Sequence, residues 1–314
     1  MLDTRLMAPS PKTSDAASRM SWLRKGSGGI PGTYNAPGTV AKPPHKAANT
    51  PRPHIPAMEW QAPAVVLDAR PLGEGGAVVS LLTEAHGRHA GLARGGASRA
   101  QAPVWQAGNL VEARWVARLA DQLGSLSGEL VHPAAALAME DPLSLALLSS
   151  ACAVAEGALP DREPHARTFH GLVSLIARLG REGAAPLLPD YVRWEAELLA
   201  ELGYGLDLAR CAVTGTHEDL THVSPKTGRA ASRAAAEPYA DRLLPLPPFL
   251  LGSQTPSEPA EWLAGLRLTG HFLGKDAFGH HHKPLPTARD LLFQRIASLA
   301  APEAGLPAEK EPDA

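Results

Sequence analysis

Cysteines, aromatic residues and long apolar runs are all scarce in this chain of 314 residues. Its two cysteines, Cys152 and Cys211, cannot build a disulfide framework, which favours a reduced, cytosolic environment. No apolar run approaches the roughly 20 residues that a membrane-spanning helix needs. No stretch has the charged and then apolar pattern of a secretory signal. These absences argue against a disulfide-stapled or membrane-spanning protein, and we expect a soluble protein of the cytoplasm.

An excess of positive charge is missing as well. The formal net charge is −2, so composition alone does not indicate nucleic-acid binding. The charges are unevenly distributed, however. Residues 1–57 hold eight lysines and arginines against two aspartates, whereas the remainder holds 22 basic and 30 acidic residues. A globular part that binds nucleic acid would therefore need a local basic face.

Residues 1–57 form a basic extension rich in proline and glycine. They contain nine prolines and five glycines but few large apolar residues, and such a segment cannot offset the entropy lost on ordering. The sequence therefore predicts a disordered extension. Two interpretations stay open: an upstream translation artefact with Met58 as the true start, or a genuine basic tail.

A different pattern begins at Trp60, where apolar and polar residues alternate with a period of two. Around Gly87 the chain has the signature of a four-residue hairpin loop, in which a glycine suits the position of positive φ. Five short segments, each with one apolar face, predict a small antiparallel barrel. They are residues 62–67, 77–83, 88–93, 110–117 and 124–131.

After Pro133 the apolar residues recur with a helical period. We expect Gly180 to end one helix and Gly203 to follow the end of another. Residues 255–258 resemble a capping box, and Thr287 is expected to cap a last helix that exposes Arg289 and Arg295. The predicted helical stripes cover residues 143–159, 169–179, 191–202, 262–273 and 287–299.

The predicted barrel region carries a set of arginines whose planar guanidinium groups suit phosphate binding and base stacking. The Gly-rich turn at 95–98 could add backbone N–H groups for a phosphate. The alternative is a solvated strand face in which Glu112 and Glu129 balance the charge. Stacking aromatics are few here, namely Trp105 and Trp115, and we expect Trp115 to belong to the core. The candidate DNA-binding residues are Arg88, Arg94, Arg99, Arg114 and Arg118.

Signals for catalysis or metal binding are weak. Cys211, His217 and His222 are only three ligands and lack the close pairs of a structural zinc site. Residues 280–282 are three adjacent histidines, which cannot converge on one ion from regular structure. Residues 73–76 are glycine-rich but lack the context of a phosphate-binding loop. No local motif marks a catalytic arrangement, so we expect no enzyme, no cofactor and no metal.

Nine short motifs, in order over some 240 residues, resemble those of the RecO family of DNA repair proteins. They are MEW at 58–60, RPLGE at 70–74, EAHGR at 84–88, LARGGA at 92–97, LGYGLDL at 202–208, CAVTG at 211–215, VSPKTG at 223–228, RLLPLP at 242–247 and KPLP at 283–286.

The resemblance implies an α+β fold with an N-terminal five-stranded OB-fold barrel at 58–135. An α-helical domain at 136–300 would follow, with a knuckle-like hairpin at about 208–235 and a flexible tail at 301–314. Many family members carry a four-cysteine zinc knuckle, but only Cys211 of that pattern is present, so the hairpin is expected without zinc.

The resemblance also implies a function, that of a recombination mediator. Such a protein binds single- and double-stranded DNA, anneals complementary strands and, with RecR, helps RecA replace single-strand DNA-binding protein (SSB) at gaps. We expect the helical domain, Arg289 included, to receive the acidic tail of SSB. The alternatives are a protein–protein adaptor that does not touch DNA, and a nucleic-acid-modifying enzyme.

Overall fold

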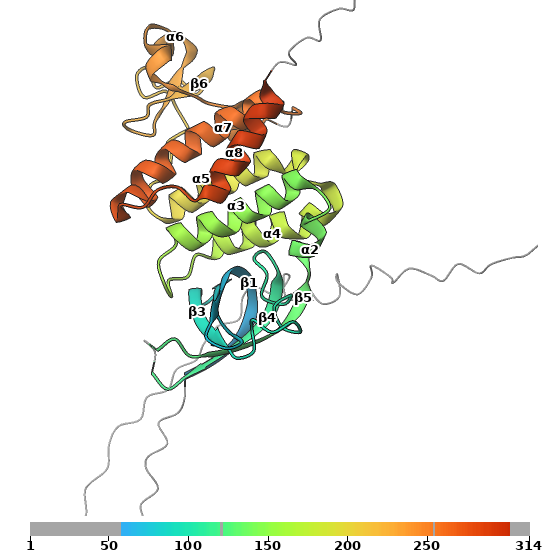
Figure 1. Cartoon of the computed structure of the whole chain (residues 1–314). Helices are drawn as coiled ribbons and strands as arrows, with labels where there is room; N and C mark the ends of the chain where they lie inside the picture. The colour runs from blue at the N-terminus through green and yellow to red at the C-terminus, as the bar shows by residue number, and fades with distance from the viewer. Residues whose placement is uncertain (1–57, 120–121, 254, 302–314) are drawn as a thin grey trace, which may run out of the picture.

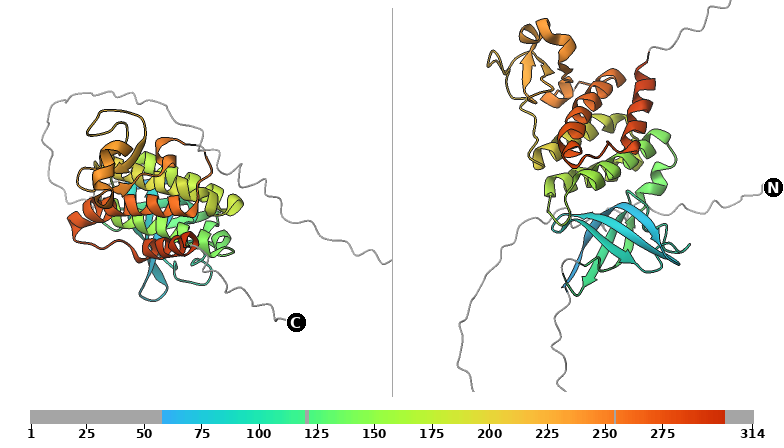
Figure 2. Two further views of the ribbon diagram at one scale, coloured as in Figure 1. Left: turned by 90° about the horizontal axis from the view of Figure 1, so that it is seen from above. Right: turned by 60° about the vertical axis from the view of Figure 1, so that its left-hand side comes forward.

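The computed structural model describes residues 58–119, 122–253 and 255–301. The predicted extension at 1–57 and nearly all of the predicted tail at 301–314 lie outside these residues. A barrel comes first along the chain, helices pack above it, and a small hairpin stands at the opposite end (Figure 1; Figure 2, right). The predicted α+β architecture, a five-stranded barrel followed by helices, is confirmed.

The N-terminal unit is a closed barrel with the strand order β1-β2-β3-β5-β4. A bulge between Val66 and Asp68 bends the long first strand, so that its first half pairs with β4 and its second half with β2. The sequence predicted all five strands. They are β1 (Met58–Leu72), β2 (Gly76–Thr83), β3 (Gly87–Ala93), β4 (Leu110–Ala117) and β5 (Ser125–His132).

The middle of β1 is buried on both sides because its alternate residues enter two different cores. Ala64 and Val66 point into the barrel, where they join Trp115. Val65 and Leu67 point out of the barrel and belong to the core of the helical domain. The barrel and the helices therefore share one continuous apolar junction.

Gly87 allows the barrel to approach the loop between α3 and α4. Its φ is +62°, as the hairpin pattern predicted, and an added Cβ would lie 2.0 Å from the carbonyl oxygen of Glu163. Only glycine fits this position without a shift of the backbone. The hairpin tip is thereby held against the helical domain.

The helical domain is built in two layers above the barrel (Figure 1). Helix α3 packs on β1 and on α8, while α5 packs on α4 and α7. The helices are α2 (Ala134–Ala138), α3 (Pro142–Ala158), α4 (Ala166–Glu182), α5 (Leu188–Glu201), α7 (Pro259–Phe272) and α8 (Thr287–Ala300). Short turns are η2 (Ala185–Leu187), η4 (Pro248–Leu251), the π-helical η5 (Leu273–Ala277) and η6 (Gly279–His281).

A hairpin separates α5 from α7 and stands away from the barrel (Figure 2). Strand β6 (Leu220–Val223) pairs antiparallel with β7 (Ala230–Ser232) and with β8 (Leu244–Pro245). The chain between β7 and β8 forms α6 (Arg233–Ala236) and η3 (Glu237–Arg242). This is the knuckle-like hairpin expected near residues 208–235.

Three predicted helix boundaries are wrong. Gly180 lies inside α4, which ends at Gly183 with φ +73°; the missing Cβ of Gly180 leaves room for Leu137 of α2. The capping box at 255–258 does not form, because α7 begins only at Pro259. Thr287 is the first helical residue of α8 rather than its cap. Gly203, in contrast, has φ +87° directly after the last turn of α5, as expected.

Candidate nucleic-acid interface

The outer face of the barrel brings two of the predicted arginines into one row. Ala93 of β3 and Trp115 of β4 are both Cα partners of Leu126 on the intervening strand β5. Arg114 is the partner of Ser127, the residue after Leu126, and Arg94 is the residue that follows Ala93 at the end of β3. Gln61 of β1 continues the row as the partner of Arg114. All four side chains are exposed, so an extended anionic strand could cross β3, β5, β4 and β1 here.

Two further predicted arginines border this row. Arg118 follows directly after β4, and Arg99 lies in the loop between β3 and β4; both are exposed. We call Arg94, Arg99, Arg114 and Arg118 the barrel arginines. Arg114 lies within β4, Arg94 and Arg118 directly follow β3 and β4, and all four residues are exposed.

Acidic residues on the same face offset part of this charge. The guanidinium of Arg114 donates to the Glu59 carboxylate at 2.5 Å, and this bond raises the pKa of Arg114. Glu112 and Glu129 are direct cross-strand partners on β4 and β5. Two like charges in these positions repel each other and would also repel a phosphate. We therefore expect DNA to cross the barrel along the row that contains Arg94 and Arg114 and to avoid Glu112 and Glu129.

Arg88 occupies a different environment from the barrel arginines. Its guanidinium donates to the Leu159 carbonyl at 2.9 Å and pairs with Glu156 and Asp161 at 2.9 and 2.8 Å. Its side chain is only 20% exposed. These three bonds join β3 to the end of α3, so Arg88 serves the junction between the two domains.

The Gly-rich turn after β3 does not offer the N–H groups that the sequence suggested. The N–H groups of Gly96, Ala97 and Ser98 donate to backbone carbonyls of Ala93, Gly75 and Gly95, respectively. These bonds fold the turn against the barrel. A phosphate at this turn would have to rely on the side chains of Arg94 and Arg99.

The aromatic residues of the barrel agree only in part with the sequence expectation. Trp115 is 2% exposed and lies in the barrel core, as expected, but Trp105, at 3%, lies there as well and is not available for stacking. The sequence missed Trp60 and His86, which stack with their ring centroids 4.7 Å apart. Both rings are partly exposed. Histidine in a hairpin turn gives no sequence signal for stacking, because its partner lies on another strand.

Arg289 is not on the surface of the helical domain, so the expectation that it receives an acidic peptide is wrong. Its side chain is 3% exposed and bonds to the buried carboxylate of Glu195 at 2.7 and 2.9 Å. Burial disfavours its charge, but the neighbouring Glu195 outweighs burial and raises the pKa of Arg289. Arg289 is therefore a structural residue.

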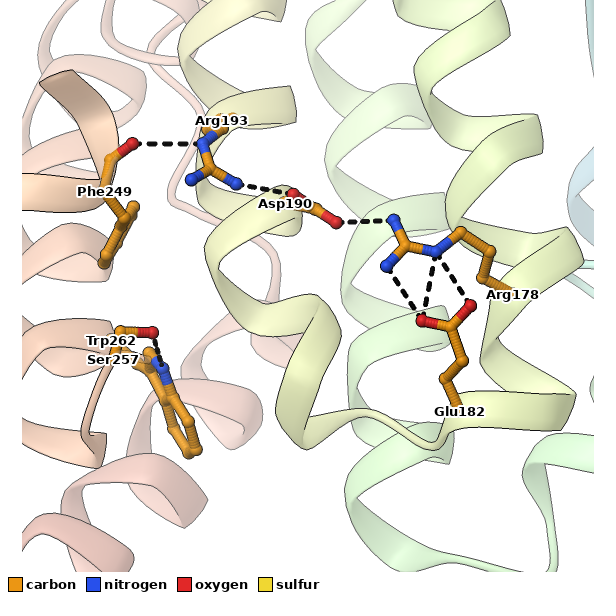
Figure 3. A network of polar contacts seen from close by, with 7 residues as sticks. All are labelled: Arg178, Glu182, Asp190, Arg193, Phe249, Ser257 and Trp262. Carbon is orange, nitrogen blue, oxygen red and sulfur yellow. Dashed lines mark hydrogen bonds and ion pairs between the residues drawn. The ribbon is translucent and has the colours of Figure 1, made fainter. Parts of the chain in front are cut away.

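Another pair of arginines, in the helical domain, meets at one carboxylate (Figure 3). Arg178 of α4 and Arg193 of α5 bind the two carboxylate oxygens of Asp190, each at 2.6 Å. Arg193 also donates to the Phe249 carbonyl at 3.1 Å and lies over the Phe249 ring. A hollow of about 320 Å³ is lined by Asp190, Arg193, Phe249 and Trp262, with prolines 186, 189 and 256 at its edge.

The indole of Trp262 is fixed at this hollow by a hydrogen bond of 2.7 Å to the Ser257 hydroxyl (Figure 3). The Nη2 atom of Arg193 makes no hydrogen bond to the rest of the described chain. The hollow thus combines two aromatic side chains with a guanidinium that still has donors to offer.

Among the described residues, no group of three or more histidine, cysteine or acidic side chains could hold a metal ion. His217 is bonded to the Ala209 carbonyl at 2.7 Å. The buried Cys211 thiol accepts from Thr214 and Ser232. Burial opposes the Cys211 thiolate, but these bonds outweigh it and lower the pKa of the thiol to about 6. No helix in the described ranges is long and apolar enough to cross a membrane.

Comparison with known proteins gives one consistent result. Residues 58–134 match the model of the Recombination protein O N terminal family, and residues 139–284 match Recombination protein O C terminal. The chain is 59% identical over 247 residues to the DNA repair protein RecO of Granulibacter bethesdensis, covering 78% of this chain and 98% of that protein. It is 57% identical over 242 residues to RecO of Acidiphilium cryptum, covering 76% and 96%.

Proposed function

The chain belongs to the RecO family of DNA repair proteins, and from this premise we propose that it is a DNA-binding recombination mediator. It binds single- and double-stranded DNA, anneals complementary single strands, and acts with RecR to help RecA load onto gapped DNA that SSB covers. We propose that the protein acts in the cytoplasm, at the nucleoid.

The observation that supports DNA binding is the row of exposed side chains formed by Arg94, Ser127, Arg114 and Gln61 across the barrel. Phosphates in contact with this row and with Arg99 and Arg118 would give an affinity that depends little on base sequence. Each neutralised phosphate releases counterions, so the affinity would fall steeply with salt. We leave Arg88 out of this surface because its guanidinium is engaged at the domain junction.

Strand annealing on this surface needs no catalytic group. Two strands bound to one protein are partly neutralised, and each raises the effective concentration of the other. The burial of the Cys152 thiol, whose pKa it raises to about 12, removes one potential nucleophile. We therefore propose a mediator without enzymatic activity.

For the acidic tail of SSB we propose the hollow between α5 and α7. Arg193 offers the Nη2 donors and a guanidinium held in place by Asp190 and the Phe249 carbonyl. A fixed guanidinium loses less entropy when it binds a carboxylate. The partly exposed Trp262 supplies the apolar contact that a peptide needs in addition to charge.

A titration with labelled oligonucleotides at two salt concentrations tests the proposed function. We expect binding of single strands that weakens by more than tenfold between 50 and 200 mM salt, and accelerated annealing of complementary strands. A protein that binds no DNA at low salt would instead fit the adaptor alternative, for which the acidic residues beside the barrel arginines provide some support.

A further inference from the structure

Three aromatic planes are stacked at the end of the barrel where β1 begins. The rings of His86 and Trp60 are 4.7 Å apart and inclined by 15°, and those of Trp60 and Trp115 are 6.0 Å apart and inclined by 12°. Buried His89 stands edge-on to both indoles. Trp115 is anchored by hydrogen bonds to the carbonyls of Ala90 and Leu123. The stack therefore runs from a fixed indole in the core to a partly exposed imidazole.

Trp60 is held in this stack by its ring contacts. Its Nε1 atom is buried and has no hydrogen-bond partner within the described residues. No hydrogen bond of the His86 ring is found among the described residues, and its backbone N–H donates to the Thr83 hydroxyl. The orientation of both rings thus depends on stacking, and a further flat ring could extend the same stack.

Charged and apolar side chains both border the stack. Arg162 and Asp161 influence the charge of His89, and three large apolar residues nearby in the chain are exposed. Met58, Leu119 and Leu123 are 49%, 52% and 39% exposed. Met58 is the strand partner of Ala117, directly before Arg118, and Leu123 provides a carbonyl that holds Trp115. An exposed apolar and aromatic patch therefore borders one of the barrel arginines.

We propose that this barrel end is a base-stacking platform on which one unpaired base of single-stranded DNA stacks on the outer face of His86, the last ring of the stack. The proposal rests on the proposed function and specifies how the same barrel distinguishes single strands from duplexes. An unpaired base exposes its face to an aromatic ring, whereas a base in a duplex is covered on both faces by its neighbours.

A peptide could also cover an apolar patch, but the flat stacked rings favour a flat ligand. Three nearly parallel planes offer no pocket for an aliphatic side chain. They do offer a surface that accepts any base, since every base has an aromatic face. Sequence-independent binding of single strands requires this property.

The test compares three variants with the wild-type protein by fluorescence anisotropy, using labelled oligothymidylate and a labelled duplex at one salt concentration. His86→Ala removes the outer ring of the platform, and His86→Phe keeps a ring there. His280→Ala is the matched control, because His280 is an exposed imidazole that stacks on Tyr204 in the helical domain. Chemical denaturation of each variant verifies the fold.

We expect His86→Ala to bind oligothymidylate about tenfold more weakly, with duplex affinity and the salt slope unchanged. His86→Phe and His280→Ala should bind as the wild type does. Equal single-strand affinity of His86→Ala and His86→Phe would overturn the platform and leave the proposed function intact. An equal loss of affinity for single strands and for duplex in His86→Ala would do the same. A wild-type protein that binds no DNA would overturn both.

Discussion

The guanidinium of Arg289 and the carboxylate of Glu195 form a buried ion pair that joins α8 to α5, with N–O distances of 2.7 and 2.9 Å. The hydroxyl groups of Tyr191 and Thr269 also donate to this carboxylate. All four side chains are buried. Both carboxylate oxygens of Glu195 therefore accept hydrogen bonds in the interior. The pair fixes the packing of α7 and α8 against α5.

Arg289→Met is expected to lower the free energy of unfolding by about 3–5 kcal/mol, because it leaves the Glu195 carboxylate buried without its counter-charge. Equilibrium unfolding in urea measures this loss. The double variant Arg289→Met with Glu195→Gln should recover part of it, since no charge then remains unpaired. A loss below about 1 kcal/mol in the single variant would show that the pair does not hold the helices.

The stability of the barrel is expected to fall as the pH drops below about 6.5. Burial lowers the pKa of His86. Burial, Arg162 and the charge of His86 lower the pKa of His89, while a hydrogen bond with the His86 backbone and the Asp161 carboxylate oppose this. The unfolded chain then binds protons that the folded chain does not, so the free energy of unfolding rises with pH across this range. Below the folded pKa values the dependence should level off.

Unfolding curves between pH 5 and 8 test this dependence in the wild type and in His89→Phe. The variant keeps a ring beside Trp60 and Trp115 but cannot bind a proton, so its stability should change less with pH. Exposed His281→Gln is the control and should follow the wild type. Identical pH profiles for His89→Phe and the wild type would contradict the assignment.

Removal of metal is expected to leave the hairpin of β6 and β7 intact. Val223 and Ala230 are fully buried there, and the described residues contain no ligand cluster. Purified protein should contain less than stoichiometric zinc, and excess chelator should not change its melting temperature. One bound zinc ion per chain together with a chelator-induced loss of stability would show that a metal holds the hairpin.

Arg193→Glu is expected to abolish binding of an acidic peptide that represents the tail of SSB. It replaces the guanidinium that is proposed to bind a peptide carboxylate by a carboxylate, which repels the acidic peptide. Calorimetric titration of the peptide measures the effect, and DNA affinity should stay unchanged. Exposed Arg267→Glu on α7 carries the same charge change away from the lining of the hollow. Equal peptide affinity of both variants would place the tail elsewhere.

Much of the barrel could be predicted from the sequence, because residues of β3 and most of β4 alternate between buried and more exposed positions. Strand β4 has the predicted bounds, and Gly87 has the expected positive φ. Sequence could not show that Val65 and Leu67 face a second core, since a continuous apolar run does not say what lies on either side.

The surface of the helical domain was harder to predict, because partners far apart in the chain decide which charges are exposed. Arg289 meets Glu195 across 94 positions, and nothing in either local sequence indicates the pair. Arg88 meets Glu156 in the same way. The stack of Trp60 and His86 likewise depends on the closure of the barrel, which brings two strands together.

The central claim is that the barrel arginines bind DNA, and the double variant Arg94→Glu with Arg114→Glu tests it most directly. Anisotropy with a labelled single strand at low salt should show no binding at concentrations that saturate the wild type, while denaturation verifies that the barrel remains folded. Arg210→Glu with Arg233→Glu makes the same charge change on the distant hairpin and should bind normally (Figure 1). Unchanged affinity of the Arg94/Arg114 variant would contradict the account.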